Sequence, residues 1–470
     1  MDPIDSFIDL AQNISCKNIS AETLESIKVV LIDFFGVMVG GTNSRPSRLC
    51  GEIVSRWGGP QEATVFANNR KVPIHAAVLA NCTAGRTLDY DDVHEQAHLH
   101  ATVAVVPPAL AISETTKVSG PEFIVSIVLG FELLARMGLA LTKGPGATGM
   151  STTYQGASLA AALVGARLLR FTPELTQNAL GIAYSQMAGN QQVIREGVDL
   201  MVVQQGLSAM SGMIALEMAQ KGLTGPKEVF CGRYGYFPVY HPQRYDMNAF
   251  TRDLGKSWEI KNTSLKPFPC CKLIHTALQA ALDLRSENNL LAEEISEVRV
   301  GINIEDYDMI CEPLGAKREP KTVVDAIYSV PYVLAVALVH GKIGLEDFTM
   351  KAIQRQEVLK FSKIVKPVKD ASLPKVTDTG IPAWVSITLK NGKKYDCYTE
   401  AVKGSPTIPM STEERIAKFN DCLFYAGRSS EIGKQILKCL EDLESMEDVS
   451  ILATLCQQKE SVLSERSTDQ

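Results

Sequence analysis

The chain has 470 residues, a formal net charge of −6, 45% hydrophobic residues and 21% charged residues. This length exceeds one ordinary hydrophobic core and predicts two folding units, and the average composition is typical of a globular protein. The acidic balance argues against a nucleic-acid partner and against an acidic membrane surface, so we expect neither.

The cysteines and the N-terminus indicate a cytoplasmic protein. The eleven cysteines are scattered and form no C-x-x-C pair, which argues against a zinc ribbon or a thioredoxin-type motif and favours a reducing compartment. Residues 1–18 carry three aspartates and lack the basic and apolar regions of a secretory signal. The longest apolar stretches are shorter than the roughly 20 residues that cross a membrane.

Apolar residues recur at helical spacing through most of the first half of the chain. Thr172 is a plausible N-cap before Pro173, which suits the first helical position. The predicted helices are Ile19–Gly41, Ile74–Leu88, Val103–Thr116, Glu122–Leu141, Gly156–Leu169, Glu174–Gly189 and Gly206–Lys221.

The pattern changes after residue 260. Ile295–Ile302 alternates with the period of a half-buried strand. Trp384–Lys390 and Lys393–Thr399 flank Asn391-Gly392 and predict a β-hairpin with a type I′ turn. Ala326–Val339 predicts a buried helix that is kinked or restarted at Pro331.

The predicted fold class is therefore mainly α, with a large all-helical domain and a smaller α+β domain. We expect the helical domain at 1–260 and the α+β domain at 261–405. Helical periodicity returns after Thr412, and we expect the helices of 406–470 to pack back on the first domain.

The densest polar segment, 88–100, places four carboxylates and three imidazoles directly before an apolar helix. Burying such a cluster is costly, and three interpretations are open. It is a solvated surface turn, a metal site built from Asp and His ligands, or a general acid–base site in which a carboxylate orients an imidazole.

A second polar segment, 264–275, lies at the junction of the two predicted domains, where clefts commonly form. His275 taken alone is more often a structural histidine than a functional one. Lys266 and Lys272 are candidate carboxylate binders, although a lysine is by default a solvated surface residue.

Three separated segments together resemble the signature segments of the MmgE/PrpD family. They are the first polar segment continued through Ala101–Ala109, the second polar segment, and Thr322–Tyr332, and Leu31–Gly36 fits the same pattern. The family includes 2-methylcitrate dehydratase, cis-aconitate decarboxylase and iminodisuccinate epimerase. The resemblance therefore implies an enzyme that acts on a small polycarboxylate.

The resemblance also implies that the α+β domain is a lid, that the protein is a homodimer, and that it uses no metal or organic cofactor. By position, Asp89, His100 and His275 match residues that line the active-site cleft of the decarboxylase branch. Two positions depart from that branch. It has a histidine where this chain reads Gly149–Gly156, and a lysine where this chain has Met201.

The reactions of this family create or quench negative charge on a carbon beside a carboxylate. Our hypothesis is that His100, oriented by Asp89 or Asp92, is a general acid–base and that His275 faces it across an interdomain cleft. Tyr154 is a candidate to replace the missing imidazole. The candidates for substrate binding are three cations and one further imidazole: Lys266, Lys272, Arg195 and His98.

Dehydration of a hydroxytricarboxylate such as 2-methylcitrate is the preferred reaction, because it is the commonest activity attached to the resemblance. Epimerisation beside a carboxylate and decarboxylation are the alternatives. A catalytically inactive binding relative and a metal hydrolase are the alternatives from other classes.

Overall fold

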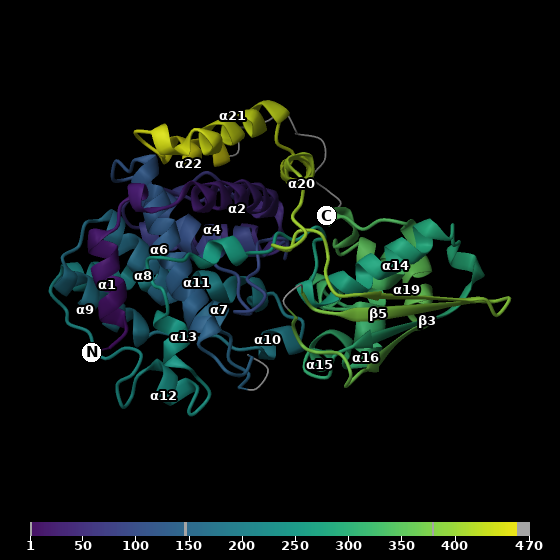
Figure 1. Cartoon of the computed structure of the whole chain (residues 1–470). Helices are drawn as coiled ribbons and strands as arrows, with labels where there is room; N and C mark the ends of the chain where they lie inside the picture. The colour runs from purple at the N-terminus through teal and green to yellow at the C-terminus, as the bar shows by residue number, and fades with distance from the viewer. Residues whose placement is uncertain (1, 145–147, 378–379, 458–470) are drawn as a thin grey trace. The chain divides into compact units, whose positions relative to one another are not determined.

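The computed structural model describes residues 2–144, 148–377 and 380–457, and it is mainly helical, as the sequence predicts (Figure 1). The described residues form two compact units. The first unit takes in the described residues up to 191, those from 202 to 263 and those from 411 onward. The second unit takes in 192–201 and the described part of 264–410.

The first unit is a helical bundle with one two-stranded sheet, β1 (Ala63–Thr64) and β2 (Lys71–Val72). The seven helices predicted within residues 19–221 all form, with ends that shift by up to six residues, whereas the helices at 4–13, 45–57, 152–155, 236–240, 247–251 and 450–456 were not predicted. Its helices are α1 (Ile4–Asn13), α2 (Ala21–Gly40), α3 (Arg45–Trp57), α4 (Ile74–Arg86), α5 (Thr102–Ser113), α6 (Gly120–Leu139), α7 (Thr152–Gln155), α8 (Ala157–Leu168), α9 (Pro173–Tyr184), α11 (Leu200–Gln220), α12 (Tyr236–Tyr240), α13 (Met247–Thr251), α20 (Thr412–Tyr425), α21 (Ser430–Glu441) and α22 (Ser450–Cys456).

The core of the first unit lies around α5, in which every residue is buried. Helices α4, α6 and α8 pack against it, as expected for a helix that is apolar on all sides. The predicted N-cap of α9 is confirmed, because the Thr172 side chain accepts a hydrogen bond of 3.2 Å from the backbone N–H of Leu175. None of the described helices is long and apolar enough to cross a membrane.

The second unit is an α+β unit. Its sheet has the strand order β4-β3-β5-β6, with β4 parallel to β3 and the other neighbours antiparallel. Helices α14 and α18 pack against each other and against the sheet. Its elements are α10 (Gln192–Arg195), α14 (His275–Glu287), β3 (Ile295–Ile302), α15 (Tyr307–Cys311), α16 (Leu314–Arg318), α17 (Val323–Ile327), α18 (Val330–His340), α19 (Gln356–Ser362), β4 (Val365–Lys369), β5 (Ala383–Leu389) and β6 (Lys394–Thr399).

The predicted hairpin forms between β5 and β6, but its turn differs from the prediction. A type I′ turn needs positive φ at both central residues. Here Gly392 has a φ of +86°, whereas Asn391 is not among the residues with positive φ. The Gly392 N–H bonds the Leu389 carbonyl at 3.0 Å, which fits a type I turn followed by a left-handed glycine.

The predicted restart at Pro331 is confirmed. Helix α17 ends at Ile327, and the Ser329 side chain caps α18 by accepting a hydrogen bond of 3.0 Å from Tyr332 N–H. Pro331 then occupies the first turn, where its missing N–H costs nothing. The helix ends at Gly341, whose φ of +73° is the left-handed conformation common at this position.

Candidate active site

The loop between α4 and α5 carries the first polar segment, and most of this segment is buried. Asp89, Asp91 and Asp92 are 0% exposed, and His94 is 1% exposed. The interpretation as a solvated surface turn is therefore wrong. Buried carboxylates need compensating charge or hydrogen bonds, so their partners define what the loop can do.

Arg86 supplies that compensating charge. It is the last residue of α4 and is 1% exposed. Its guanidinium contacts Oδ1 of Asp89 and lies 3.1 Å from Oδ1 of Asp91. One planar cation thus ties two carboxylates of the loop to the end of a buried helix, which fixes the start of the loop.

His100 lies at the far end of this loop and is held at four points. Its backbone N–H donates to Oγ1 of Thr153 at 3.3 Å, and its backbone carbonyl accepts from Nε2 of Gln205 at 2.6 Å. Its ring nitrogen Nδ1 lies 2.8 Å from the backbone carbonyl of Asp92 and 3.0 Å from Oδ2 of Asp91. Because both neighbours of Nδ1 are acceptors, the proton sits on Nδ1, and Nε2 carries the lone pair in the neutral ring.

The carboxylate placed at His100 Nδ1 corrects our hypothesis. We expected the side chain of Asp89 or Asp92 there, and the structure places Asp91. Asp89 turns its Oδ1 to Arg86 from a backbone with a φ of +47°, while Asp92 reaches the ring through its backbone carbonyl. In a loop, neighbouring side chains point in directions set by local φ and ψ, which the composition of the segment does not determine.

Asp92 is a buried acid with an unusual titration. Its Oδ1 accepts a hydrogen bond from the Thr102 hydroxyl at the start of α5. Burial raises the pKa of Asp92 to about 7, and the neighbouring Asp91 carboxylate adds to the rise. This carboxyl group therefore gains and loses its proton near neutral pH.

Tyr154 lies in α7, one residue after Thr153, and is 2% exposed. Burial raises the pKa of Tyr154 to about 12, although the nearby Arg86 guanidinium opposes the rise. The phenol is therefore protonated at neutral pH, beside the same arginine that binds the loop carboxylates. His98, another of the three candidate histidines, is half-buried in a turn with a φ of +53°.

His94 fixes the middle of the loop and has a structural role. Its Nε2 lies 3.1 Å from Oε2 of Glu259 in the 3₁₀-helix η4 (Glu259–Asn262), and its Nδ1 accepts from Ala97 N–H at 3.2 Å. The bond to His94 is the main reason that the pKa of Glu259 is lowered. Both ring nitrogens are thus used in holding the loop.

In the second unit, His275 is the first residue of α14 and is fully buried. Its Nε2 lies 3.1 Å from the backbone carbonyl of Cys270, and its ring meets the edge of Phe268 at a centroid distance of 5.4 Å. Since a carbonyl only accepts, Nε2 carries the proton and Nδ1 carries the lone pair of the neutral ring.

The lysines of the second polar segment are not surface residues. Lys266 is 0% exposed and Lys272 is 7% exposed, so the interpretation as solvated groups is wrong. A further lysine, Lys317 in α16, is also buried, and burial lowers its pKa, with Arg195 among its charged neighbours. Arg195 is exposed and donates to the backbone carbonyl of Asp308 at 3.3 Å.

The structure thus gathers His100, Asp89, Asp92 and Tyr154 in the first unit. His275, Lys266, Lys272 and Arg195 belong to the second unit. That His100 and His275 meet around one substrate stays a prediction. The described residues contain no group of three or more His, Cys, Asp or Glu side chains arranged to hold a metal ion.

Besides Asp91, the residues Arg86, Thr153, Gln205 and Lys317 were not predicted from the sequence. Arg86 had a usable signal, because three carboxylates at 89, 91 and 92 need a nearby cation and Arg86 precedes them by one helical turn. The sequence carries no comparable signal for Thr153, Gln205 or Lys317, because the groups that they contact lie far away in the chain.

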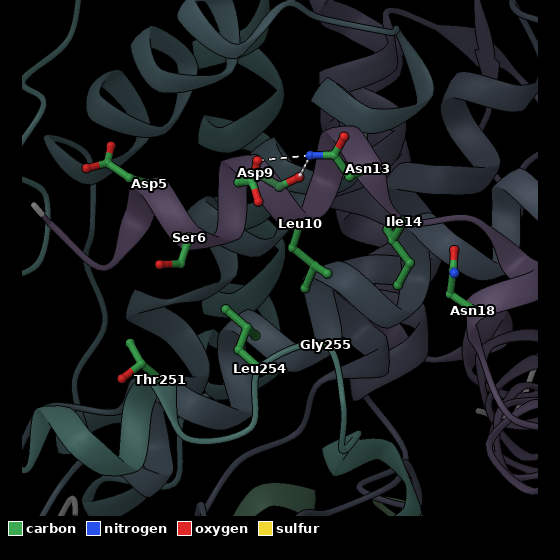
Figure 2. A pocket seen from close by; sticks show the side chains of 10 residues that line it. All are labelled: Asp5, Ser6, Asp9, Leu10, Asn13, Ile14, Asn18, Thr251, Leu254 and Gly255. Carbon is green, nitrogen blue, oxygen red and sulfur yellow. Dashed lines mark hydrogen bonds between the residues drawn. The ribbon is translucent and has the colours of Figure 1, made fainter.

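A surface pocket of about 810 Å³ between α1 and the segment after α13 is a poor site for a polyanion (Figure 2). Asp5 and Asp9 line this pocket, and no lysine or arginine is among its lining residues. The side-chain amide of Asn13 donates a hydrogen bond of 2.9 Å to Oδ1 of Asp9, and both residues lie in the pocket wall. None of the predicted site residues lines this pocket. Its acidic wall would repel a polycarboxylate.

Comparison with known families matches the MmgE/PrpD N-terminal domain over residues 5–247 and the MmgE/PrpD C-terminal domain over residues 268–442. The chain belongs to the MmgE/PrpD family. Among curated proteins it is similar to the cis-aconitate decarboxylase-like protein oryM of Aspergillus oryzae, with 24% identity over 460 residues, 93% of this chain and 94% of the relative.

Two further relatives of this MmgE/PrpD protein are cis-aconitate decarboxylases. The protein of Aspergillus terreus is 24% identical over 469 residues, which cover 95% of this chain and 94% of the relative. The protein of Homo sapiens is 23% identical over 471 residues, which cover 96% of this chain and 94% of the relative. The similarity therefore spans both units.

Proposed function

We propose that this MmgE/PrpD protein is a lyase that acts on a small polycarboxylate and uses His100 to move a proton at a carbon beside a carboxylate. One observation carries the proposal. Nδ1 of His100 donates to the Asp92 carbonyl at 2.8 Å, with the Asp91 carboxylate 3.0 Å away, so Nε2 is the basic nitrogen. A carboxylate at Nδ1 also stabilises the imidazolium that forms when Nε2 takes a proton.

The remaining parts of the chemistry come from buried groups. Tyr154, protonated at neutral pH, is suited to donate a proton to a leaving group or to a carbanion. The buried ammonium groups of Lys266, Lys272 and Lys317 are suited to bind substrate carboxylates, because a charge that stays buried is stabilised by an opposite charge. The names of the relatives support a polycarboxylate as the substrate class.

Dehydration of a hydroxytricarboxylate such as 2-methylcitrate is the first reaction to test. His100 would take a proton from the carbon beside a carboxylate, the C–O bond to the hydroxyl group would break as the C=C bond forms, and Tyr154 would protonate the leaving oxygen to give water. The departures at Gly149–Gly156 and Met201 from the decarboxylase branch favour this reaction over decarboxylation.

Decarboxylation is the second candidate, because the curated relatives named above are cis-aconitate decarboxylases or resemble them. In this reaction the bond to one carboxylate breaks, carbon dioxide leaves, and the electron pair left on carbon takes a proton. The reaction needs a proton donor and no leaving hydroxyl group.

One experiment separates these reactions. Purified protein is incubated in D₂O with 2-methylcitrate, citrate or cis-aconitate and followed by proton and carbon-13 NMR, because dehydration of 2-methylcitrate gives an alkene whose carbons carry no proton. A new alkene signal without loss of carbon dioxide indicates dehydration, loss of carbon dioxide indicates decarboxylation, and deuterium uptake without an alkene indicates epimerisation. Tight binding of these acids without any turnover would instead identify an inactive binding relative.

The matched variants are His100→Asn and His75→Asn. We expect His100→Asn to lower kcat by about 10²- to 10⁴-fold, the usual contribution of a general acid–base. His75 lies on α4, is half-buried, faces Glu217 at 3.5 Å, and should be replaceable without loss of activity. Full activity in His100→Asn would contradict the proposed role.

A further inference from the structure

The loop that carries Asp89 and Asp91 is tied to a helix near the C-terminus. Lys418 of α20 is 4% exposed, and its Nζ lies 2.6 Å from Oδ1 of Asp33 in α2. The same ammonium group donates to the backbone carbonyl of Tyr90 at 2.9 Å and lies 4.0 Å from the centre of the Tyr90 ring. One cation from position 418 therefore contacts both α2 and the residue between Asp89 and Asp91.

Two glycines of α2 allow this approach. A Cβ on Gly36 would lie 2.9 Å from the Phe419 ring, and a Cβ on Gly40 would lie 3.0 Å from Leu88 and 3.1 Å from Cys422. Asp33 lies on the same helical face, three residues before Gly36. Helix α2 thus packs closely against α20 and the start of the loop, consistent with the placement of α2 and α20 (Figure 1).

The geometry points to Lys418 as a positioning residue of the active site, which acts on His100 through Tyr90 and Asp91. This inference rests on the proposed function of His100. The Tyr90 carbonyl belongs to the peptide group that continues into Asp91, so the hydrogen bond from Lys418 fixes the direction in which the Asp91 side chain leaves the backbone. Oδ2 of Asp91 in turn lies 3.0 Å from Nδ1 of His100, and the next residue, Asp92, accepts the Nδ1 hydrogen bond at its backbone carbonyl.

The simpler alternative is that Lys418 only joins α20 to α2. A buried ion pair is a weak source of net stability, because desolvation of both charges offsets their attraction. An ion pair that only joins two helices needs no contact with the active-site loop. The Lys418 ammonium group, in addition to its ion pair with Asp33, contacts the backbone carbonyl and the ring of Tyr90 in that loop. The two roles predict different measurements.

The test compares Lys418→Met with a variant of a second, more exposed ion pair that joins α2 to the C-terminal part of the chain. Lys28 of α2 lies 2.6 Å from Oε2 of Glu444 and donates to the backbone carbonyl of Glu441 at 2.8 Å, and neither partner belongs to the loop. Lys28→Met therefore removes a carboxylate contact and a carbonyl contact as Lys418→Met does. The double variant Asp33→Asn with Lys418→Met avoids leaving an unpaired buried carboxylate, so it serves if the single variant does not fold.

The first readout needs no turnover. In protein labelled with ¹⁵N-histidine, the Nδ1 proton of His100 is assigned by its absence in His100→Asn. We expect this resonance to shift or to be lost by exchange in Lys418→Met and in the double variant, and to stay unchanged in Lys28→Met. An unchanged resonance in a folded Lys418 variant would overturn the inference while leaving the proposed function intact.

The second readout is kinetic. We expect kcat to fall about tenfold or more in the Lys418 variants while KM stays within about twofold, because misplacement of a proton-transfer group slows chemistry more than binding. Lys418→Arg keeps the charge and should recover part of kcat. A lower melting temperature with unchanged kcat would assign Lys418 to the structural role and overturn the inference.

Discussion

Oδ2 of Asp91 lies 3.0 Å from Nδ1 of His100, while Oδ1 of the same carboxylate lies 3.1 Å from the Arg86 guanidinium. Asp91 therefore links a buried cation at the end of α4 to the ring that we propose moves protons. This arrangement fixes the tautomer of His100 and leaves Nε2 as the basic nitrogen.

Replacing Asp91 by Asn should lower kcat by about tenfold to 100-fold, because a neutral amide no longer stabilises the imidazolium form of His100. Glu95→Gln is the control, since Glu95 belongs to the same loop. Steady-state kinetics of both variants check this prediction. Equal activity of the Asp91 variant and wild type would show that the ring does not depend on the carboxylate.

Asp92 should reduce stability as pH rises. Its pKa is about 7 in the folded protein against 3.8 for an ordinary aspartate, so between these values the folded chain holds a proton that the unfolded chain has released. The free energy of unfolding should then fall with pH by about 1.4 kcal/mol per unit from this residue alone. Urea unfolding of wild type and Asp92→Asn at several pH values tests this, and the variant should lack that slope between about pH 4 and 7.

His241 should make the free energy of unfolding rise with pH, which is opposite to the effect of Asp92. It is buried, its Nε2 lies 3.0 Å from the Tyr236 hydroxyl oxygen, and burial lowers the pKa of His241 to about 4. Between about pH 4 and 6.5 the unfolded chain binds a proton that the folded chain does not, so its contribution is lost as pH falls. In His241→Asn the free energy of unfolding should rise less steeply with pH over this range, and an unchanged slope would contradict the lowered pKa.

Lys266 should contribute to binding of a polycarboxylate. Lys266→Met should weaken the affinity for tricarballylate, an unreactive tricarboxylate, by about tenfold or more, as expected for loss of one charge-assisted hydrogen bond. Lys321→Met is the control, because Lys321 is exposed. Isothermal titration calorimetry measures both. Equal affinities in the two variants would remove Lys266 from the binding site.

Much of the secondary structure follows from local sequence. The apolar periods predict the main helices, Thr172 and Pro173 mark the start of α9, and Pro331 marks the start of α18. These features depend on residues within one or two turns of each other, so a single sequence contains their cause. The turn at Asn391-Gly392 was predicted in place but not in type, because hairpin loops of different length use the same residues.

The sequence by itself therefore determined the mainly helical class, the positions of most elements and the polar segments that hold His100 and His275. Tertiary structure alone decided that Asp91 faces Nδ1 of His100, that Arg86 binds two carboxylates of the loop, and that Lys418 reaches Tyr90 across 328 residues. The physical reason is that a loop side chain takes its direction from backbone angles and from distant partners. Packing of α20 against α2 brings Lys418 to the Tyr90 carbonyl, and no local pattern in the sequence records that contact.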